Sequence, residues 1–217
     1  AIAGGHQEWI ICSAFGKAGL LGQAIQAFGD NINRYSDKLK IKVYHSGELV
    51  PGLESLDAVR SGAAQASYGA PYYWTNVSDA IEFVATCPFG MNAMEQNAWC
   101  YYGGGIEEAD KIYNALGLKF LPMGNTGNQM GGWFNKEINT PADYQGLKMR
   151  MPGLGGRTIE KLGATPVLLA GPDVLPSLSS GAVDAAEWIC PAADLGAGLY
   201  QAAKYYYGPG WHEPSTL

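Results

Sequence analysis

The chain has 217 residues, of which 47% are hydrophobic, so it can fill one large α/β domain or two small ones and is neither disordered nor fibrous. Its net charge of −6, without any run of lysine or arginine, excludes the basic surface that nucleic acids or anionic membranes require. No stretch of 18 apolar residues exists, because Lys17, Gln23 and Asp30 interrupt the most apolar N-terminal region, so no transmembrane helix is predicted.

The first predicted elements form a strand–helix–strand unit. Residues 41–45 alternate as in a strand, residues 53–60 have helical spacing, and residues 64–68 read as a second strand. Gly62 lies between the helix and the second strand, where a left-handed residue commonly ends a helix. The order of these signals predicts a βαβ unit whose last strand ends at Tyr68.

The middle of the chain combines helical segments with glycine-rich turns. We expect one helix around Trp99 and Tyr102, another over residues 106–116, a strand over 118–122, and an extended stretch over 125–134. The triple glycine at 103–105 lacks the spacing of both common nucleotide-binding motifs, so it predicts a turn and not a phosphate loop.

A second strand–helix–strand unit repeats the pattern of the first. Residues 165–170 and 183–188 read as strands, residues 174–179 are helical, and Gly181 occupies the place that Gly62 has in the first unit. Two such units indicate two α/β lobes whose strand ends face a shared cleft. One continuous sheet is the alternative that this pattern leaves open.

The four cysteines show no spacing typical of a zinc site. We interpret them as buried thiols, since free cysteine is among the most buried residue types, and leave one disulfide open. The cysteines are Cys12, Cys87, Cys100 and Cys190.

Several motifs together resemble the DctP family of solute receptors of tripartite ATP-independent periplasmic (TRAP) transporters, in particular the branch that binds 2-oxo acids and lactate. The resemblance covers almost the whole chain. The motifs that carry it are Ser46–Gly52, Pro88–Gly90, Gly124–Phe134, Gly146–Arg150, Leu162–Pro166, Glu187–Trp188, Tyr205–Tyr207 and Pro209–Glu213.

The resemblance implies a periplasmic, non-enzymatic receptor with two α/β lobes that close on a small monocarboxylate, such as pyruvate or lactate, for delivery to membrane permease subunits. It divides the chain into lobe I at residues 1–124, lobe II at 125–212, and the start of a return segment at 213–217. Family members continue for about another hundred residues, so the C-terminal part of the fold is expected to be missing here. A homodimer is expected only if the missing C-terminal helix is present.

The resemblance also implies the binding residues. The ligand carboxylate is held by Arg150, and a sodium or calcium ion that touches this carboxylate is held by Gln129, Glu187 and Trp188, which also belong to the substrate site. The remaining substrate-site residues are Asn125, Tyr72, Tyr73 and Phe89. One departure from the family pattern is Cys190, which replaces a more usual glycine before the proline.

The chemistry of the residues agrees with part of this assignment. Arg150 ends a predicted strand, and a guanidinium group binds a carboxylate through two parallel hydrogen bonds, which lysine cannot do. Glu187 ends an apolar strand, where an ionised group needs compensation. If both share a cleft with a ligand carboxylate, either Glu187 is protonated or a cation lies beside it. A surface arginine and an ordinary carboxylate at a strand end remain the alternatives.

Two other functions are compatible with this fold class. A metal-assisted lyase or isomerase acting on an organic acid would use Glu187 or His212 as general base, but the sequence carries no motif for a catalytic nucleophile or paired carboxylates. A sensor would use the same cleft to signal to a partner. His212 and Glu213 also suggest a metal or acid–base pair, although a histidine beside a glutamate in a loop is more often structural.

Overall fold

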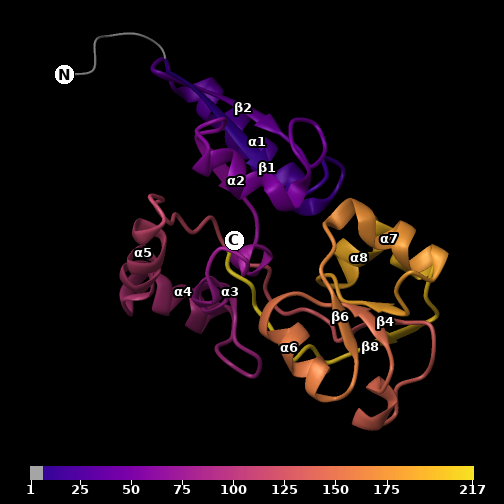
Figure 1. Cartoon of the computed structure of the whole chain (residues 1–217). Helices are drawn as coiled ribbons and strands as arrows, with labels where there is room; N and C mark the ends of the chain where they lie inside the picture. The colour runs from indigo at the N-terminus through magenta and orange to yellow at the C-terminus, as the bar shows by residue number, and fades with distance from the viewer. Residues whose placement is uncertain (1–6) are drawn as a thin grey trace. The chain divides into compact units, whose positions relative to one another are not determined.

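The computed structural model describes residues 7–217 and shows an α/β protein (Figure 1). It divides into two compact units, Ala1–Gly69 with Ala170–Pro172, and Ala70–Leu169 with Asp173–Leu217. The lobe boundary predicted between residues 124 and 125 falls inside the second unit, and the division into lobes stays a prediction. In the described part of the chain, no helix is both long and apolar enough to cross a membrane.

The first unit is a parallel sheet with the strand order β2-β1-β3. Its strands are β1 (Gln7–Ser13), β2 (Leu39–Tyr44) and β3 (Ala66–Tyr68), and its helices are α1 (Leu20–Tyr35) and α2 (Ser55–Arg60). A Cβ at Gly29 would lie 2.9 Å from Val43 Cγ2, so glycine is what allows α1 to approach β2 this closely.

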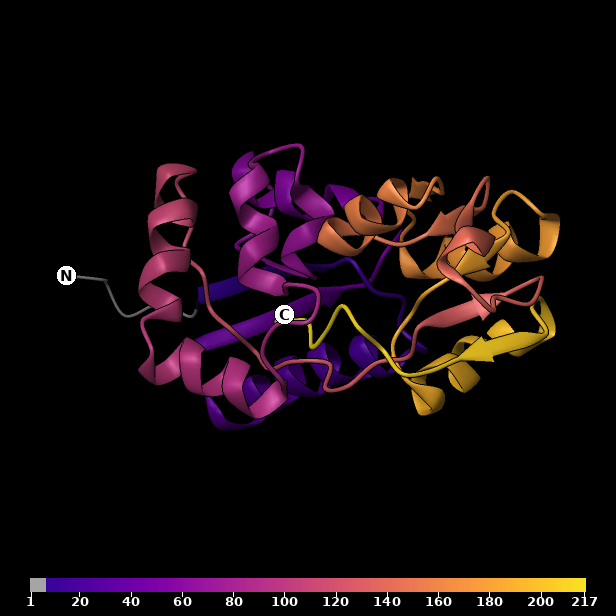
Figure 2. The same ribbon diagram turned by 90° about the horizontal axis from the view of Figure 1, so that it is seen from below.

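The second unit contains a mixed sheet with the strand order β6-β5-β7-β4-β8. The parallel part consists of β5 (Lys148–Arg150), β6 (Thr165–Val167) and β7 (Ala185–Ala186), joined through α6 (Gly153–Lys161) and α7 (Gly171–Ser180). Strand β4 (Gly132–Phe134) pairs antiparallel with β7 and with β8 (Tyr205–Tyr207), and Figure 2 shows the yellow β8 beside β4.

The two predicted strand–helix–strand units are present, and each is part of a larger βαβαβ unit. The first strand of each larger unit lies in the middle, β1 between β2 and β3, and β5 between β6 and β7. Strand β1 was not predicted, so the separation of β2 from β3 by a central strand was not predicted either. Gly62 (φ +81°) and Gly181 (φ +75°) both adopt the predicted left-handed conformation.

Most of the remaining elements belong to the second unit, where they precede its sheet or connect its strands. Short helices are η2 (Pro71–Trp74), η3 (Asp79–Ile81), α3 (Glu82–Ala85), η4 (Pro141–Tyr144), α8 (Pro191–Ala197) and η5 (Leu199–Gln201), and η1 (Gly52–Glu54) precedes α2. Helices α4 (Ala93–Tyr102) and α5 (Gly105–Ala115) confirm the two helices predicted in the middle of the chain. Asn92 caps α4 together with Glu95 in a capping box.

Two local predictions were wrong. No strand forms over residues 118–122, because the backbone pairs with another segment only further along, where Met123 N–H donates to Leu217 O (2.8 Å) and Asn125 bridges to Thr216. Cys87 is exposed, whereas Cys12 and Cys100 are buried as expected. The triple glycine forms the predicted turn between α4 and α5, with Gly104 at φ +90°.

The core of the second unit lies on both faces of its sheet. One cluster includes Phe134, Met149, Ile159 and Ala185, and another includes Val174, Leu178, Val183, Ala186 and Leu199. Each fully buried aliphatic or aromatic side chain stabilises the fold by about 1.5–3 kcal/mol relative to exposure. These clusters hold the ends of β5 and β7 in place, and the polar site begins directly beyond them.

Candidate functional site

Two charged residues lie where neighbouring parallel strands end. Arg150 is the last residue of β5, and Glu187 directly follows β7, which pairs with β5 in parallel register. The chain leaves β5 toward β6 on one side and later returns to β7 on the other. Arg150 therefore lies at a topological switch point, the place where open α/β sheets commonly bind ligands.

Arg150 is a buried cation with several partners in the second unit. Its side chain is 1% exposed, and Nη1 donates to the Glu187 backbone carbonyl (2.7 Å) and to Glu187 Oε2 (3.2 Å). Nη2 donates to the Tyr73 hydroxyl (3.2 Å), Nε points to Leu169 O (3.4 Å), and the guanidinium lies 5.1 Å from the Trp188 ring centre. Burial opposes the charge, but Tyr73 and Glu187 outweigh it and raise the pKa of Arg150, so the group stays ionised.

Gln129 brings a third polar side chain to the same place. In one orientation of its amide, the oxygen lies 2.5 Å from Glu187 Oε1 and 3.0 Å from the Trp188 carbonyl oxygen. Three oxygens then converge with no donor between them, while the amide nitrogen donates to Thr126 Oγ1 (2.5 Å). In the opposite orientation the NH₂ group donates to both oxygens, and the amide oxygen accepts from Thr126.

The two orientations of the Gln129 amide differ in whether they suit a bound cation. A hard metal ion prefers carboxylate, amide and backbone carbonyl oxygens, which are the groups of Glu187, Gln129 and Trp188. A cation among them favours the orientation with the amide oxygen inward, and the NH₂ orientation satisfies the same groups without one. The predicted metal ligands thus lie together and have the right donor chemistry.

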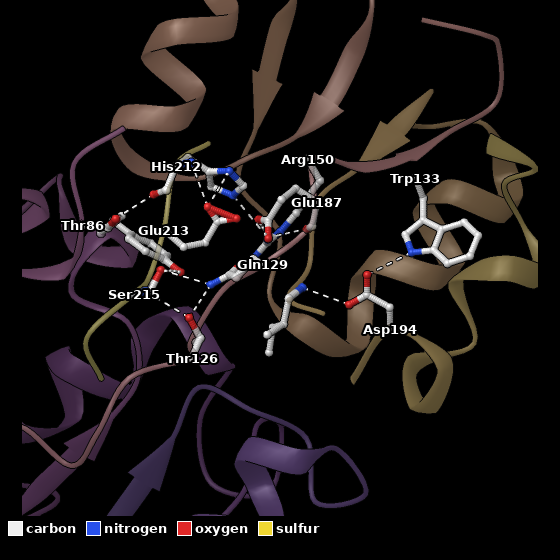
Figure 3. A network of polar contacts seen from close by, with 12 residues as sticks. Thr86, Thr126, Gln129, Trp133, Arg150, Glu187, Asp194, His212, Glu213 and Ser215 are labelled. Carbon is white, nitrogen blue, oxygen red and sulfur yellow. Dashed lines mark hydrogen bonds and ion pairs between the residues drawn. The ribbon is translucent and has the colours of Figure 1, made fainter. Parts of the chain in front are cut away.

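His212 and Glu213 complete the polar cluster (Figure 3). His212 Nε2 lies 3.4 Å from Glu187 Oε1, and Nδ1 lies 3.0 Å from Glu213 Oε2, although neither ring nitrogen has the direction of a good hydrogen bond. Ligand atoms of Glu187, His212 and Glu213 all lie within 4.8 Å of one another. Glu213 Oε1 is buried without a hydrogen-bond partner, so its carboxylate offers a further oxygen to a cation.

Burial and the nearby Glu187 shift the pKa values of His212 and Glu213. Burial opposes protonation of His212, but the nearby Glu187, helped by Glu213, raises the pKa of His212 above its ordinary value. Burial, reinforced by Glu187 and opposed by His212, raises the pKa of Glu213 to about 7. The backbone of His212 is held in turn by Thr86 Oγ1, which donates to its carbonyl at 2.6 Å.

Tyrosines 72 and 73 border this cluster, and their part in ligand binding stays a prediction. Tyr73 is 4% exposed and bonds Arg150, and the Tyr72 hydroxyl donates to Ser215 Oγ (3.2 Å). Burial raises the pKa of both tyrosines, so both hydroxyls stay protonated. Trp188 supplies its ring to Arg150 and its carbonyl to the oxygen cluster.

The structure places Asn125 and Phe89 outside this immediate cluster. The Asn125 amide donates to Ala93 O (3.1 Å) and Asn97 Oδ1 (2.7 Å), which ties it to α4. Phe89 is 83% exposed and stacks on Trp211, with ring centres 6.0 Å apart. Their roles in ligand binding stay predictions.

Two features of the cluster carry little signal in the sequence. A histidine beside a glutamate in a loop favours a structural role for His212 and Glu213, and nothing in the sequence shows that this loop returns to the end of β7. Asp194 belongs to no motif, although its carboxylate accepts three hydrogen bonds beside the cluster. The signal that was present is an aspartate in the apolar turn after Cys190-Pro191, where a buried acid requires partners.

A pocket of about 210 Å³ lies beside the cluster and is distinct from it. Its lining includes Tyr72, Met151, Gly153 and Arg157, but not Arg150, Glu187 or Gln129. Those three side chains are 1%, 2% and 6% exposed, so the polar cluster is almost completely shielded from solvent.

Comparison with known proteins identifies the family. The family described as bacterial extracellular solute-binding protein, family 7, matches residues 15–217. A monocarboxylate 2-oxoacid-binding periplasmic protein of Nostoc sp. is 47% identical over 177 residues, which cover 82% of this chain and 49% of that protein.

Solved structures show the same fold. A TRAP periplasmic solute-binding protein of Pseudoalteromonas atlantica, with bound sodium and pyruvate, matches with a TM-score of 0.92 at 40% identity over 98% of this chain and 65% of that one. A counterpart from Colwellia psychrerythraea, with bound calcium and pyruvate, matches with a TM-score of 0.91 at 41% identity, and the same two fractions are covered. The chain therefore spans about half of the Nostoc protein and about two thirds of these structures. The predicted α/β fold class is confirmed, and the chain belongs to the family 7 bacterial extracellular solute-binding proteins, the DctP family of TRAP solute receptors.

Proposed function

We propose that this chain forms the ligand site of a periplasmic TRAP receptor that captures a small 2-oxo or 2-hydroxy monocarboxylate, such as pyruvate or lactate, together with a sodium or calcium ion. The receptor then delivers the acid to membrane permease subunits without changing it chemically. One observation carries the proposal. At the switch point of the sheet, Arg150 bonds Glu187, and a Glu187 oxygen lies beside the Gln129 amide and the Trp188 carbonyl. The names of the relatives, which bind pyruvate with sodium or calcium, support it.

Charge balance explains why such a site needs both an arginine and a cation. Arg150 and Glu187 neutralise each other as a buried ion pair. A monocarboxylate adds one negative charge to a site that excludes water, where an uncompensated charge is costly. A cation held by Glu187, Gln129 and the Trp188 carbonyl offsets that charge, and Glu213 is placed to contribute a further oxygen.

The chain's own residues also account for orientation. Arg150 bonds Glu187, Tyr73 and Leu169, and these contacts fix the plane of its guanidinium group. A carboxylate that enters replaces part of these bonds with charge-assisted ones of its own. The Trp188 ring and the two tyrosines make the surroundings of Arg150 largely aromatic, which disfavours a second charged group. Such a site suits a small monocarboxylate, and we expect it to leave the acid chemically unchanged.

The test is calorimetry with pyruvate on the full chain as its gene encodes it. We expect tight binding in buffers that contain sodium or calcium, and weak binding when calcium is chelated and a bulky organic cation replaces sodium. Pyruvate recovered unchanged from the complex supports binding over catalysis. Binding that is the same with and without these ions would contradict the cation's role, and conversion of the acid would favour an enzyme.

A substitution at Glu187 tests the same proposal. Glu187→Gln keeps the size of the side chain and one acceptor oxygen but removes the anion, so both ion and pyruvate should bind more weakly, by roughly 30-fold or more. Glu82→Gln is the matched control, because Glu82 is an equally buried glutamate paired with Arg157 outside the polar cluster. Equal loss in both variants would show a general effect of removing a buried carboxylate.

A further inference from the structure

The segment Glu187–Ile189 presents two of the three oxygens of the proposed ion site, yet it follows a strand of only two residues. Backbone pairing with β5 holds its first residue, since Glu187 N–H donates to Arg150 O (3.0 Å), and other contacts must hold the rest. On one side, Ile189 O accepts from Met130 N–H at 2.8 Å, which ties it to the residue next to Gln129. On the other side, Ile189 N–H donates to Asp194 Oδ1 at 2.9 Å.

Asp194 is a buried carboxylate in the first turn of α8. It is 0% exposed, and its second oxygen, Oδ2, accepts from Trp133 Nε1 (3.0 Å) and from the Tyr206 hydroxyl (2.9 Å). Trp133 lies on β4 and Tyr206 on β8, and their rings stack with centres 4.0 Å apart. Figure 3 shows Asp194 between Trp133 and the segment that leads to the site.

We propose that Asp194 is a positioning residue for ion and acid binding: it anchors Ile189 to the β4–β8 pair and thereby fixes where the Trp188 carbonyl and Glu187 point. The inference rests on the proposed function. Asp194 does not touch the site itself, since its contacts are Ile189, Trp133 and Tyr206. Residues that orient metal ligands from behind typically change metal affinity 10- to 100-fold when they are replaced.

The pattern of donors explains why aspartate is required. All three partners present an N–H or O–H to Asp194, so both of its oxygens act as acceptors. Asparagine has one oxygen and one NH₂ group. If the asparagine oxygen accepts from Ile189 N–H, its NH₂ group faces the indole N–H of Trp133, and two donors then oppose each other. If the amide turns so that its oxygen accepts from Trp133, Ile189 N–H loses its acceptor.

The experiment compares Asp194→Asn with Tyr206→Phe in the full chain, by calorimetry with pyruvate in calcium buffer and by calcium titration. We expect Asp194→Asn to weaken calcium and pyruvate binding about 10- to 100-fold. Tyr206→Phe removes a hydrogen bond from the same carboxylate and keeps the stacked ring and the Ile189 anchor, so we expect binding within about threefold of wild type. Equal weakening in both variants would mean that Asp194 acts only on stability, and would overturn the inference.

A double variant tests the anchor directly, and covers the case in which Asp194→Asn alone fails to fold. Trp133→Phe removes the opposing N–H, so in Trp133→Phe/Asp194→Asn the amide oxygen holds Ile189 while the NH₂ group donates to Tyr206. Binding should return to within about threefold of Trp133→Phe alone. A folded double variant that still binds 10-fold or more weakly overturns the inference. Wild-type protein that fails to bind pyruvate with either ion overturns the proposed function, and the inference with it.

Discussion

At the scale of single residues, the most informative contact is the one between Arg150 and Glu187. The sequence predicts both residues at strand ends but does not show what compensates the charge of Glu187. The structure shows a direct ion pair, reinforced by a bond from Arg150 to the Glu187 backbone carbonyl. The same arginine that is expected to hold the ligand is therefore also part of the folded core.

Replacement of Arg150 by lysine should affect both properties. Lysine keeps the charge but cannot reach Tyr73, Leu169 and two oxygens of Glu187 at once, so pyruvate affinity should fall by about 2–5 kcal/mol, or roughly 30-fold to several thousandfold. Stability should fall as well, because buried partners lose their bonds. Calorimetry and thermal unfolding measure the two effects.

Arg157→Lys serves as the control for this substitution. Arg157 is half exposed and forms ion pairs with Asp79 and Glu82 away from the polar cluster. Binding should be unchanged in this variant. An affinity of Arg150→Lys within about twofold of wild type would remove Arg150 from the ligand site.

At the scale of elements, the two βαβαβ units end their second helices in the same way. Both Gly62 and Gly181 have a positive φ, and a Cβ added at either position would meet open space. The requirement for glycine is therefore conformational and not steric. A substitution at either position therefore measures the free-energy cost of the left-handed backbone alone, without a steric clash.

Alanine at Gly62 or at Gly181 should destabilise the protein by about 1–2 kcal/mol, since left-handed backbone costs that much for a residue with a Cβ. For a chain of this size, the melting temperature falls by roughly 2–4 °C per kcal/mol. Gly196→Ala in α8 is the control, because it also adds a Cβ in open space but lacks a positive φ, and it should be neutral or stabilising. A loss of stability in the control equal to that in the other two would contradict the explanation.

The contact between α3 and α6 predicts a dependence of stability on pH. Burial raises the pKa of Glu82 above its ordinary value of 4.5, although Arg157 Nε lies 3.1 Å away and opposes the shift. The folded state then binds a proton more readily than the unfolded state, so this group's contribution to stability falls as pH rises above 4.5 through its folded pKa.

Glu82→Gln removes that titration. The melting temperature of the variant relative to wild type should therefore be more favourable at pH 8 than at pH 5, whatever its absolute value. Differential scanning calorimetry at both pH values gives the comparison. A difference that is constant, or larger at pH 5, would show that the ionised form of Glu82 is not penalised in the folded protein.

At the scale of the whole molecule, the buried cluster implies that ion and acid bind as a linked pair. Acid alone adds an unbalanced negative charge, and ion alone adds an unbalanced positive one. Each should therefore raise the affinity for the other by the same factor. The two together should stabilise the protein more than the sum of their separate effects.

Thermal unfolding with pyruvate, with calcium, and with both measures this coupling. Pyruvate at about one hundred times its dissociation constant in calcium buffer should add about 2.7 kcal/mol of apparent stability. Without calcium and sodium, the same concentration should add far less. Strictly additive shifts in melting temperature would show that ion and acid do not share a site.

The sequence by itself determined the features that depend on local signals. Hydrophobic periodicity predicted the helices at α4, α5 and α7 and the strands of both repeated units, and the glycine between helix and strand in each unit predicted a left-handed residue. Arg150 and Glu187 could be placed at strand ends because each follows an apolar strand pattern. Strand β1 contains a short β-favouring run at residues 9–12, but its own sequence does not show that it lies in the middle of the sheet.

Only the tertiary structure decided which distant residues meet. Gln129, Glu187 and His212 are far apart in the chain, and their convergence depends on how β4, β5, β7 and the segment after β8 pack. The same holds for Asp194, whose burial creates its need for three donors. Aromatic residues show the limit most clearly: a buried core and a ligand pocket select the same side chains, so the sequence could not separate Tyr73, which bonds Arg150, from Phe89, which stacks on Trp211 at the surface.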